Sequence, residues 1–474
     1  MKRDFSIWHT AFRGEKKELF PKRQRLKVWI LFLLFTFAFP SSAHAEKLSF
    51  IRDAEIEHYL HELSTPIFRA AKLNPRAVNL LIIKNGEMNA FVAGGQNIFI
   101  YTGLLQSAET PGQLQGVIAH ETGHIAGGHL VRGSRAMENA SAQSMIGMLA
   151  ALAAGLASGN GQVAIGAFGA AQSITERNLM SYSRAQESAA DSAALRFLDS
   201  TEQSSEGFYD FMKKLAGQEL IPEDQQSQYV RTHPMSQDRL QNIGHHLENS
   251  PYANKKMPAL FNQMHERMQA KLLGFLRPEA ALLRYTDKDP RIRARYARAI
   301  ALYRKSHIDK ALPLIDRLLK EEPDNPFFHE LKGQILFENG RIKPAIVSYQ
   351  KAVALLSDSA LLRIAYAHAL LESKDDTQLD KIIKQLTEAD RLEARDPQTW
   401  RFLAAAWNRK HKITQVSYYQ GLVFYGLAEE SIALNKKEAA SRYALRAIGI
   451  LPKGSPYWLR AQDIRLETDK DPKD

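Results

Sequence analysis

Apolar and polar residues are spaced in two different ways over residues 46–110. From about residue 50 to residue 73 the apolar positions recur at helical spacing, whereas 78–83 is a continuous apolar run and 97–101 is a short alternating one. Helical spacing is typical of an amphipathic helix, and the two runs are typical of strands. This zone therefore predicts a helix packed on a small β-sheet. We expect the strand at 97–101 to lie at the sheet edge, where an extended peptide can pair with its backbone, with an interior position as the alternative.

Residues 111–250 carry helical patterns. Pro111 stands at a predicted helix start, and a further helix is predicted over about residues 176–198. Between them lies an apolar tract rich in small residues, 145–171, whose two halves are each too short to span a bilayer. We expect this tract to pack on the core or to act as a lid, with contact to a membrane surface as the alternative.

From about residue 290 the helical pattern repeats every 34 residues. The period is visible in small residues such as Ala299, Gly333 and Ala367, and residues 421–454 fit the same register. A period of about 34 residues, with small residues where paired helices cross, is typical of tetratricopeptide repeats. The sequence therefore predicts an α-solenoid, which either binds proteins on its concave face or serves only as a support.

The first 45 residues have the pattern of an export signal. A basic stretch precedes the apolar run 28–39, which is shorter than the roughly 20 residues that a membrane span needs. Residues 43–45 (Ala-His-Ala) offer a small-x-small cleavage site, after which the mature chain would begin at Glu46. We expect a cleaved signal peptide at residues 1–45 and a bacterial periplasmic location, with an uncleaved anchor as the alternative.

Composition limits the chemistry. The 474 residues include no cysteine, so any metal site must use His, Asp or Glu. The formal charge is +11, but nine of the 63 Lys and Arg residues lie in the first 45 residues, against three acidic ones. The rest of the chain is only mildly basic and carries no recognisable nucleic-acid motif, so we expect no nucleic-acid partner.

The strongest chemical signal is the His-Glu-Thr-Gly-His motif at residues 120–124. Residues four apart lie on one face of a helix, so His120 and His124 can bind one metal ion. Glu121 lies beside that face, where its carboxylate can take a proton from water. The motif therefore predicts a metal-dependent hydrolase.

A catalytic zinc ion usually has a third protein ligand and one open position. A histidine ten residues after the first one is one solution, but that position is Leu130, and we interpret the neighbouring His129 as a packing or supporting residue. A carboxylate from another helix is the alternative. Glu187 and Asp191 share a helical face: the first can bind zinc, and the second can accept a hydrogen bond from a ligand histidine.

These two motifs, with the segment 89–95 (Asn-Ala-Phe-Val-Ala-Gly-Gly), resemble the zinc peptidases related to HtpX and the CAAX prenyl proteases. With the export signal and the repeats, the chain is similar to the periplasmic beta-barrel assembly-enhancing proteases of Gram-negative bacteria. The resemblance implies a mainly α protein: a gluzincin-type zinc metallopeptidase domain with a small β-sheet, residues 46–265, and then tetratricopeptide repeats, residues 266–470.

The resemblance also implies the site. One zinc ion per chain would be held by His120, His124 and Glu187, with Glu121 as general base. His233 and Arg239 lie in a His-Pro segment that recurs in such enzymes, and they are candidates to stabilise the oxyanion. His233 could instead occupy the open zinc position and keep the enzyme latent, or be a structural residue.

The function implied is a zinc-dependent endopeptidase for quality control and assembly of outer-membrane proteins. It would hydrolyse misfolded or stalled outer-membrane proteins, while the repeats bind these clients or the barrel assembly machinery. Peripheral contact with the outer membrane is a further option. The alternative function is a chaperone-like repeat scaffold whose protease centre is mostly latent.

Overall fold

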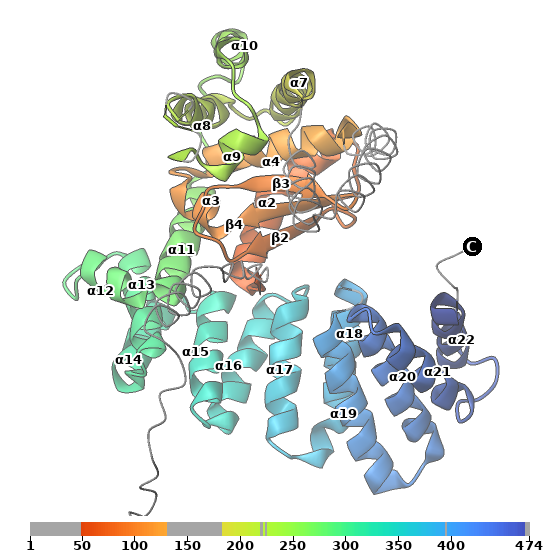
Figure 1. Ribbon diagram of the computed structural model, residues 1–474. Helices are drawn as coiled ribbons and strands as arrows, with labels where there is room; N and C mark the ends of the chain where they lie inside the picture. Colours follow the sequence, from red (N-terminus) through yellow and green to blue (C-terminus); the bar gives the residue numbers. More distant parts are fainter. Residues whose placement is uncertain (1–48, 130–182, 219–220, 223–224, 394–395, 470–474) are drawn as a thin grey trace, which may run out of the picture. The chain divides into compact units, whose positions relative to one another are not determined.

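The computed structural model describes residues 49–129, 183–218, 221–222, 225–393 and 396–469 (Figure 1). The predicted signal peptide and the apolar tract 145–171 lie outside the described residues. Within the described ranges, no helix combines the length and the apolar character that a membrane crossing requires.

The elements fall into a sheet-bearing part and a repeat part. The strands are β1 (Phe50–Ile51), β2 (Asn79–Ile83), β3 (Ala90–Ala93) and β4 (Asn97–Tyr101). The helices up to the repeats are α2 (Ala54–Ala70), α3 (Thr102–Ser107), α4 (Pro111–Ala126), α7 (Arg184–Ser200), α8 (Glu206–Ala216), α9 (Gln228–Thr232), α10 (Gln237–Asn249), α11 (Ala259–Leu276) and α12 (Pro278–Arg284). The repeat helices are α13 (Ile292–Arg304), α14 (Ile308–Glu321), α15 (Pro326–Glu338), α16 (Ile342–Leu355), α17 (Ala360–Glu372), α18 (Leu379–Leu392), α19 (Pro397–Thr414), α20 (Ser417–Ala433), α21 (Lys437–Ile448) and α22 (Pro456–Asp469), with a 3-10 turn, η2 (Asp376–Gln378), before α18.

The four described strands form one sheet in the order β1-β2-β4-β3. β4 pairs in parallel with β2, where Phe99 lies opposite Leu81, and antiparallel with β3, where Phe99 lies opposite Phe91. The expectation of an edge strand at residues 97–101 is therefore wrong, because β4 is hydrogen-bonded on both sides. Among the described strands, β3 is the outer one next to it.

The first helix begins later than its apolar spacing predicts. Phe50 and Ile51 extend the sheet by pairing with β2, and Asp53 then caps α2 by accepting hydrogen bonds from the amides of Glu55 and Ile56, both at 3.0 Å. Such a cap satisfies amides that a helix start leaves unpaired. One apolar face of α2 is fully buried in the core, through Tyr59, Leu60, Leu63, Ile67 and Phe68.

A close approach of two helices brings the two predicted motifs together. α4 begins at Pro111, as predicted, with Thr110 as its cap. At Gly123 an added Cβ would lie 2.7 Å from the carbonyl oxygen of Ala190 on α7, so only glycine allows this helix contact. The α4–α7 packing therefore places residues 120–124 directly against the segment that carries Glu187.

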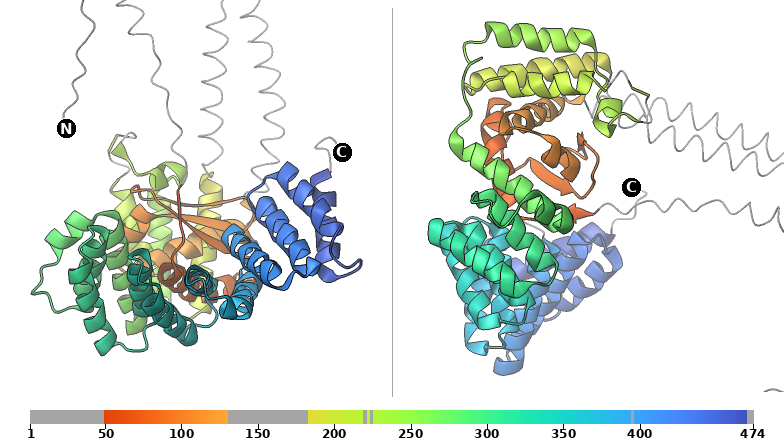
Figure 2. Two further views of the ribbon diagram at one scale, coloured as in Figure 1. Left: turned by 90° about the horizontal axis from the view of Figure 1, so that it is seen from below. Right: turned by 90° about the vertical axis from the view of Figure 1, so that its left-hand side faces the viewer.

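The predicted repeats are present as antiparallel helix pairs. Two successive periods of 34 residues, 292–325 and 326–359, contain the pairs α13–α14 and α15–α16, and α17–α18 follow in the same manner (Figure 1). The predicted fold class, a mainly α chain with a small sheet followed by a repeat solenoid, is confirmed. The boundary at 265/266 stays a prediction. α11 runs through it, in contact with α2 and α3 on one side and with α13 on the other (Figure 2).

A buried ionic cluster joins α2, α11 and the repeats. Lys271 on α11 is 2% exposed, and its Nζ lies 2.8 Å from Asp53 Oδ2, 3.4 Å from Glu55 Oε2 and 3.5 Å from Glu330 Oε2 on α15. Arg267 Nε lies 3.2 Å from Glu55 Oε1. We call these five residues the junction cluster. Their ion pairs tie the amino-terminal segment to the first repeats.

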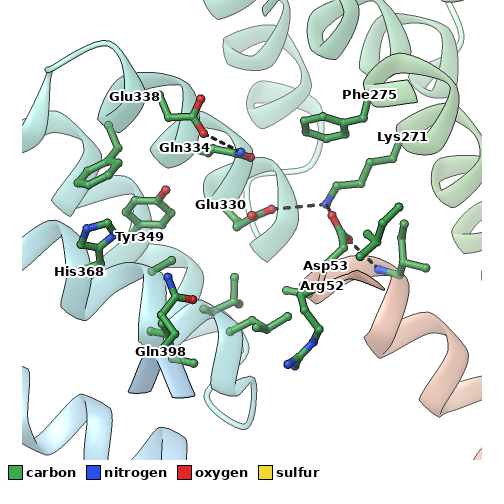
Figure 3. Close-up of a pocket in the computed structure, with 18 of the residues that line it drawn as sticks. Arg52, Asp53, Lys271, Phe275, Glu330, Gln334, Glu338, Tyr349, His368 and Gln398 are labelled. Atoms are coloured by element: carbon green, nitrogen blue, oxygen red, sulfur yellow. Dashed lines mark hydrogen bonds and ion pairs between the residues drawn. The ribbon is translucent and has the colours of Figure 1, made fainter. Parts of the chain in front are cut away.

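A cavity of about 610 Å³ opens beside the junction cluster. Figure 3 shows Lys271 and Glu330 facing each other at its wall. Phe275, Tyr349 and His368 supply aromatic surface, and several of the lining residues lie on α15 and α17. The repeats therefore present a cavity of mixed apolar and charged character.

Candidate metal centre

Three helices bring four ligand-type side chains to one point. His120 and His124 lie on α4, Glu187 lies in the first turn of α7, and His233 caps the carboxyl end of α9. One ligating atom from each residue lies within 4.8 Å of the others, and all four side chains are fully buried. We call this set the metal centre.

The distances within the metal centre fit a single metal ion. His120 Nε2 and His124 Nε2 are 3.1 Å apart, and they lie 3.4 Å and 3.3 Å from the two carboxylate oxygens of Glu187. Ligands bound at about 2.1 Å in a tetrahedron are about 3.4 Å apart, so these spacings suit zinc. His233 Nδ1 lies 3.4 Å from His120 Nε2 and 3.1 Å from Glu187 Oε1, in the same shell.

Asp191 and Arg239 contact His120 and Glu187 next to the metal centre. Asp191 Oδ1 lies 2.9 Å from His120 Nδ1, the ring nitrogen that does not face the metal centre. Arg239 holds both oxygens of Asp191, at 2.6 and 2.9 Å, and its Nη1 lies 2.8 Å from Glu187 Oε2 and donates to the carbonyl of Pro234. Arg239 was expected as an oxyanion donor, but here its guanidinium nitrogens face carboxylates and a backbone carbonyl. This placement favours an anchoring role.

Charge coupling in the metal centre is strong. Burial alone would lower the pKa of His120, but the carboxylates of Asp191 and Glu187 outweigh it and raise the pKa to about 10. Burial lowers the pKa of His124 to about 3, although the carboxylate of Glu187 opposes this. Although burial opposes it, the three histidines hold the pKa of Glu187 well below its usual range. Without metal, a proton on His120 therefore balances the carboxylates, which is the charge that a bound cation would replace.

Glu121 is a buried carboxylate beside the metal centre. Its Oε1 accepts a hydrogen bond from the hydroxyl of Tyr229 at 3.4 Å and lies 3.5 Å from His233 Nε2. Burial raises its pKa, although the nearby histidines oppose this. Within the described part of the chain, its Oε2 has no hydrogen-bond partner, so this oxygen can face a reacting water.

One neighbour of the metal centre, Tyr229, was not predicted from the sequence, and a second, His129, was interpreted as a packing or supporting residue. Tyr229 stacks on His233, with ring centres 4.4 Å apart, in addition to its contact with Glu121. Its spacing of four residues before His233 is the signal that could have indicated it. His129 contacts the far side of His124, with 3.0 Å between the two Nδ1 atoms, so it lies behind a ligand and not at the metal centre.

A His-Glu-x-x-His helix whose two histidines meet a carboxylate from a second helix defines a metalloprotease. Residues 51–247 match the model of peptidase family M48, and the chain therefore contains a domain of this family. This range includes every residue of the metal centre, as well as Glu121, Asp191 and Arg239.

The sequence of this chain is similar to those of several proteases, two of which match it over most of its length. A beta-barrel assembly-enhancing protease of Yersinia pestis is 24% identical over 416 residues, which cover 85% of this chain and 80% of that protein. The protein of the same name from Escherichia coli K12 is 22% identical, with 81% and 79% covered. Metalloprotease LoiP of Escherichia coli K12 is 30% identical over 172 residues, which cover 36% of this chain and 63% of that protein.

Proposed function

We propose that this chain is a zinc-dependent endopeptidase of the bacterial periplasm that acts in the assembly and quality control of outer-membrane proteins. The observation that carries the hydrolytic part is the convergence of four buried ligating atoms within 4.8 Å. The client class and the location rest on the similarity to proteases named for beta-barrel assembly, and on the signal-like pattern of residues 1–45.

The geometry of the metal centre supports the following roles for its residues. His120, His124 and Glu187 would hold zinc, which when bound activates water and polarises the scissile carbonyl. Glu121 takes the proton of the attacking water and gives it to the leaving amine, and its raised pKa suits both transfers. Asp191 fixes the ring of His120, and Arg239 holds the two carboxylates in place.

His233 supports a latent state of this enzyme. Its Nε2–H donates to the carbonyl of Ala90 at 3.3 Å, which leaves the lone pair of Nδ1 directed at Glu187 and His120. We propose that His233 occupies the open ligand position and must leave before a substrate carbonyl can enter. Under this proposal His233→Ala cleaves casein faster than wild type. Slower cleavage would instead indicate a transition-state donor, and unchanged cleavage a structural role.

The repeats would hold the client. The cavity beside the junction cluster offers aromatic rings and both signs of charge on the repeat helices α15 and α17. We propose that it receives an extended segment of an outer-membrane protein or of the barrel assembly machinery. His368, about one-third exposed at this cavity, is the residue to change. His368→Ala should weaken cleavage of an unfolded outer-membrane barrel protein and leave cleavage of casein unchanged.

The test of the proposed function compares wild type with Glu121→Gln. The variant should lose about 10²–10⁴-fold in casein cleavage, because it lacks the general base, and should keep its zinc. Glu109→Gln, at an exposed position just before α4, is the matched control and should cleave like wild type. Equal cleavage by wild type and Glu121→Gln would contradict the enzyme and favour the alternative function, a repeat scaffold.

A further inference from the structure

His129 lies against the back of a metal ligand. α4 ends at Ala126, and Gly128 takes a left-handed conformation, with φ of +61°, before His129. The turn folds the imidazole of His129 back towards α4, where the side chain is only 4% exposed. Its ring meets that of His124 edge-on, with ring centres 5.0 Å apart.

The glycine at position 127 makes room for the imidazole ring of His129. A Cβ added at Gly127 would lie 2.4 Å from His129 Nε2 and 2.9 Å from two of its ring carbons. The imidazole therefore rests directly on the backbone of Gly127, and a larger residue there would displace it. The backbone of Gly127 is ordinary helical, with φ of −71° and ψ of −12°, so the fit of the ring is what requires glycine at this position.

The contact between His124 Nδ1 and His129 Nδ1 determines which ring nitrogen of each histidine carries the proton. His124 Nε2 faces the metal centre, so in a metal-bound His124 the proton must lie on Nδ1 and be donated. His129 Nδ1, 3.0 Å away, can accept it only in its neutral form with the proton on Nε2. His120 has the same arrangement on its own side, but its partner is the carboxylate of Asp191.

We propose that His129 is the positioning residue for the ligand His124: by accepting a hydrogen bond from its Nδ1–H, it fixes the ring orientation and tautomer in which Nε2 binds the metal. This proposal rests on the proposed zinc centre. The motif at 120–124 therefore extends functionally through Gly127 and His129. Partners behind ligand histidines typically contribute about 10- to 100-fold to metal affinity.

The test measures the zinc dissociation constant of the full chain by competition with a chromophoric chelator. His129→Phe keeps a ring but has no acceptor, and should bind zinc about 10- to 100-fold more weakly. His129→Asn places its Oδ1 where Nδ1 lies and should stay close to wild type. Gly127→Ala leaves the imidazole intact but displaces it, and should weaken binding like His129→Phe. His245→Phe, the same change at an exposed histidine, is the control.

The outcomes separate the proposals. Wild-type affinity in both His129→Phe and Gly127→Ala would overturn the role of His129 and leave the zinc centre standing. Equal losses in His129→Asn and His129→Phe would also overturn it, because packing of the ring would then be the cause. A wild-type chain that binds no zinc would overturn the metal centre itself. Thermal unfolding of the metal-free variants checks that each one folds.

Discussion

The metal centre and the junction cluster are both buried groups of charged or ligating side chains, and they differ in what lies in the middle. In the junction cluster the ammonium of Lys271 lies 2.8 to 3.5 Å from three carboxylates. In the metal centre, two imidazole nitrogens and a carboxylate approach each other to 3.1 to 3.4 Å, and the guanidinium of Arg239 lies behind them.

This difference teaches how a buried ionic group is to be interpreted. Groups that converge on a side-chain cation are already balanced, and their role is to tie elements together. Three imidazoles and a carboxylate that each aim one ligating atom at a common point form the donor set of a metal ion, so their arrangement indicates a cation that they bind. The two clusters therefore differ in role: the metal centre is arranged for chemistry, and the junction cluster holds the repeats to the sheet-bearing part.

The largest expected effect comes from removing the central cation of the junction cluster. Lys271→Met keeps the length of the side chain but leaves three carboxylates facing each other, and breaking a buried pair in this way costs about 3–5 kcal/mol. We expect a lower midpoint of guanidinium unfolding, with the repeats and the sheet-bearing part now unfolding separately. Fluorescence and circular dichroism together would detect the loss of a common transition.

The matched control for this change is Lys332→Met on α15. Its ion pair with Asp316 is partly exposed, so its loss should cost about 1 kcal/mol at most. The double variant Lys271→Met with Glu330→Gln should recover part of the stability, because one unpaired charge is gone. A Lys271→Met protein as stable as the control would contradict the view of the junction cluster as a fastener.

A smaller effect is expected for Asp191, which contacts the metal ligand His120. Asp191→Asn removes the negative partner of His120 and one of the two carboxylates that Arg239 holds. Zinc affinity should fall about 10- to 100-fold. Chelator competition measures this, with Asp199→Asn as the control near the end of the same helix. A variant that keeps the wild-type affinity would show that His120 needs no anionic support.

The smallest effect concerns pH. Burial and the neighbouring Asp53 and Glu55 raise the pKa of Glu330 to about 7, although Lys271 opposes this. The folded state therefore holds this proton more tightly than the unfolded chain, so the stabilisation is complete below about pH 4.5 and is lost as the pH rises through about 7. Glu330→Gln has no such loss. Relative to wild type, it should gain about 2 kcal/mol in unfolding free energy between pH 5 and pH 8.

The control for the pH series is Glu438→Gln, at an exposed carboxylate in the first turn of α21. Its difference from wild type should be the same at pH 5 and pH 8. If the Glu330→Gln difference were equally flat, the carboxylate would be ionised throughout this range, and the attraction of Lys271 would outweigh its burial.

Much of the fold follows from local spacing. The structure confirms the strands at 78–83 and 97–101, the helix start at Pro111 and the 34-residue repeat. Each of these features can be recognised from the order of residues along the chain, without knowing which distant segments meet. The position of β4 inside the sheet does not follow, because strand order is decided by pairing between distant segments. The same holds for the junction cluster, in which Asp53 and Glu330 meet through the packing of α11.

For the candidate site, too, the sequence predicted the residues with a local spacing and missed contacts that depend on the folded backbone. Residues four apart on a helix identified the pair of histidines, and a second such pair identified Glu187 with Asp191, because both spacings are local. The stacking of Tyr229 on His233 and the turn that returns His129 to His124 depend on the exact path of the backbone. Sequence spacing does not carry that information.

The most direct test of the central claim is the metal content of the purified chain, together with X-ray absorption at the zinc edge. The account predicts one zinc ion per chain, with nitrogen and oxygen ligands at about 2.0–2.2 Å, and a large loss of zinc in Glu187→Gln. A wild-type chain without zinc, or one whose zinc is retained when both His120 and His124 are changed to alanine, would contradict it.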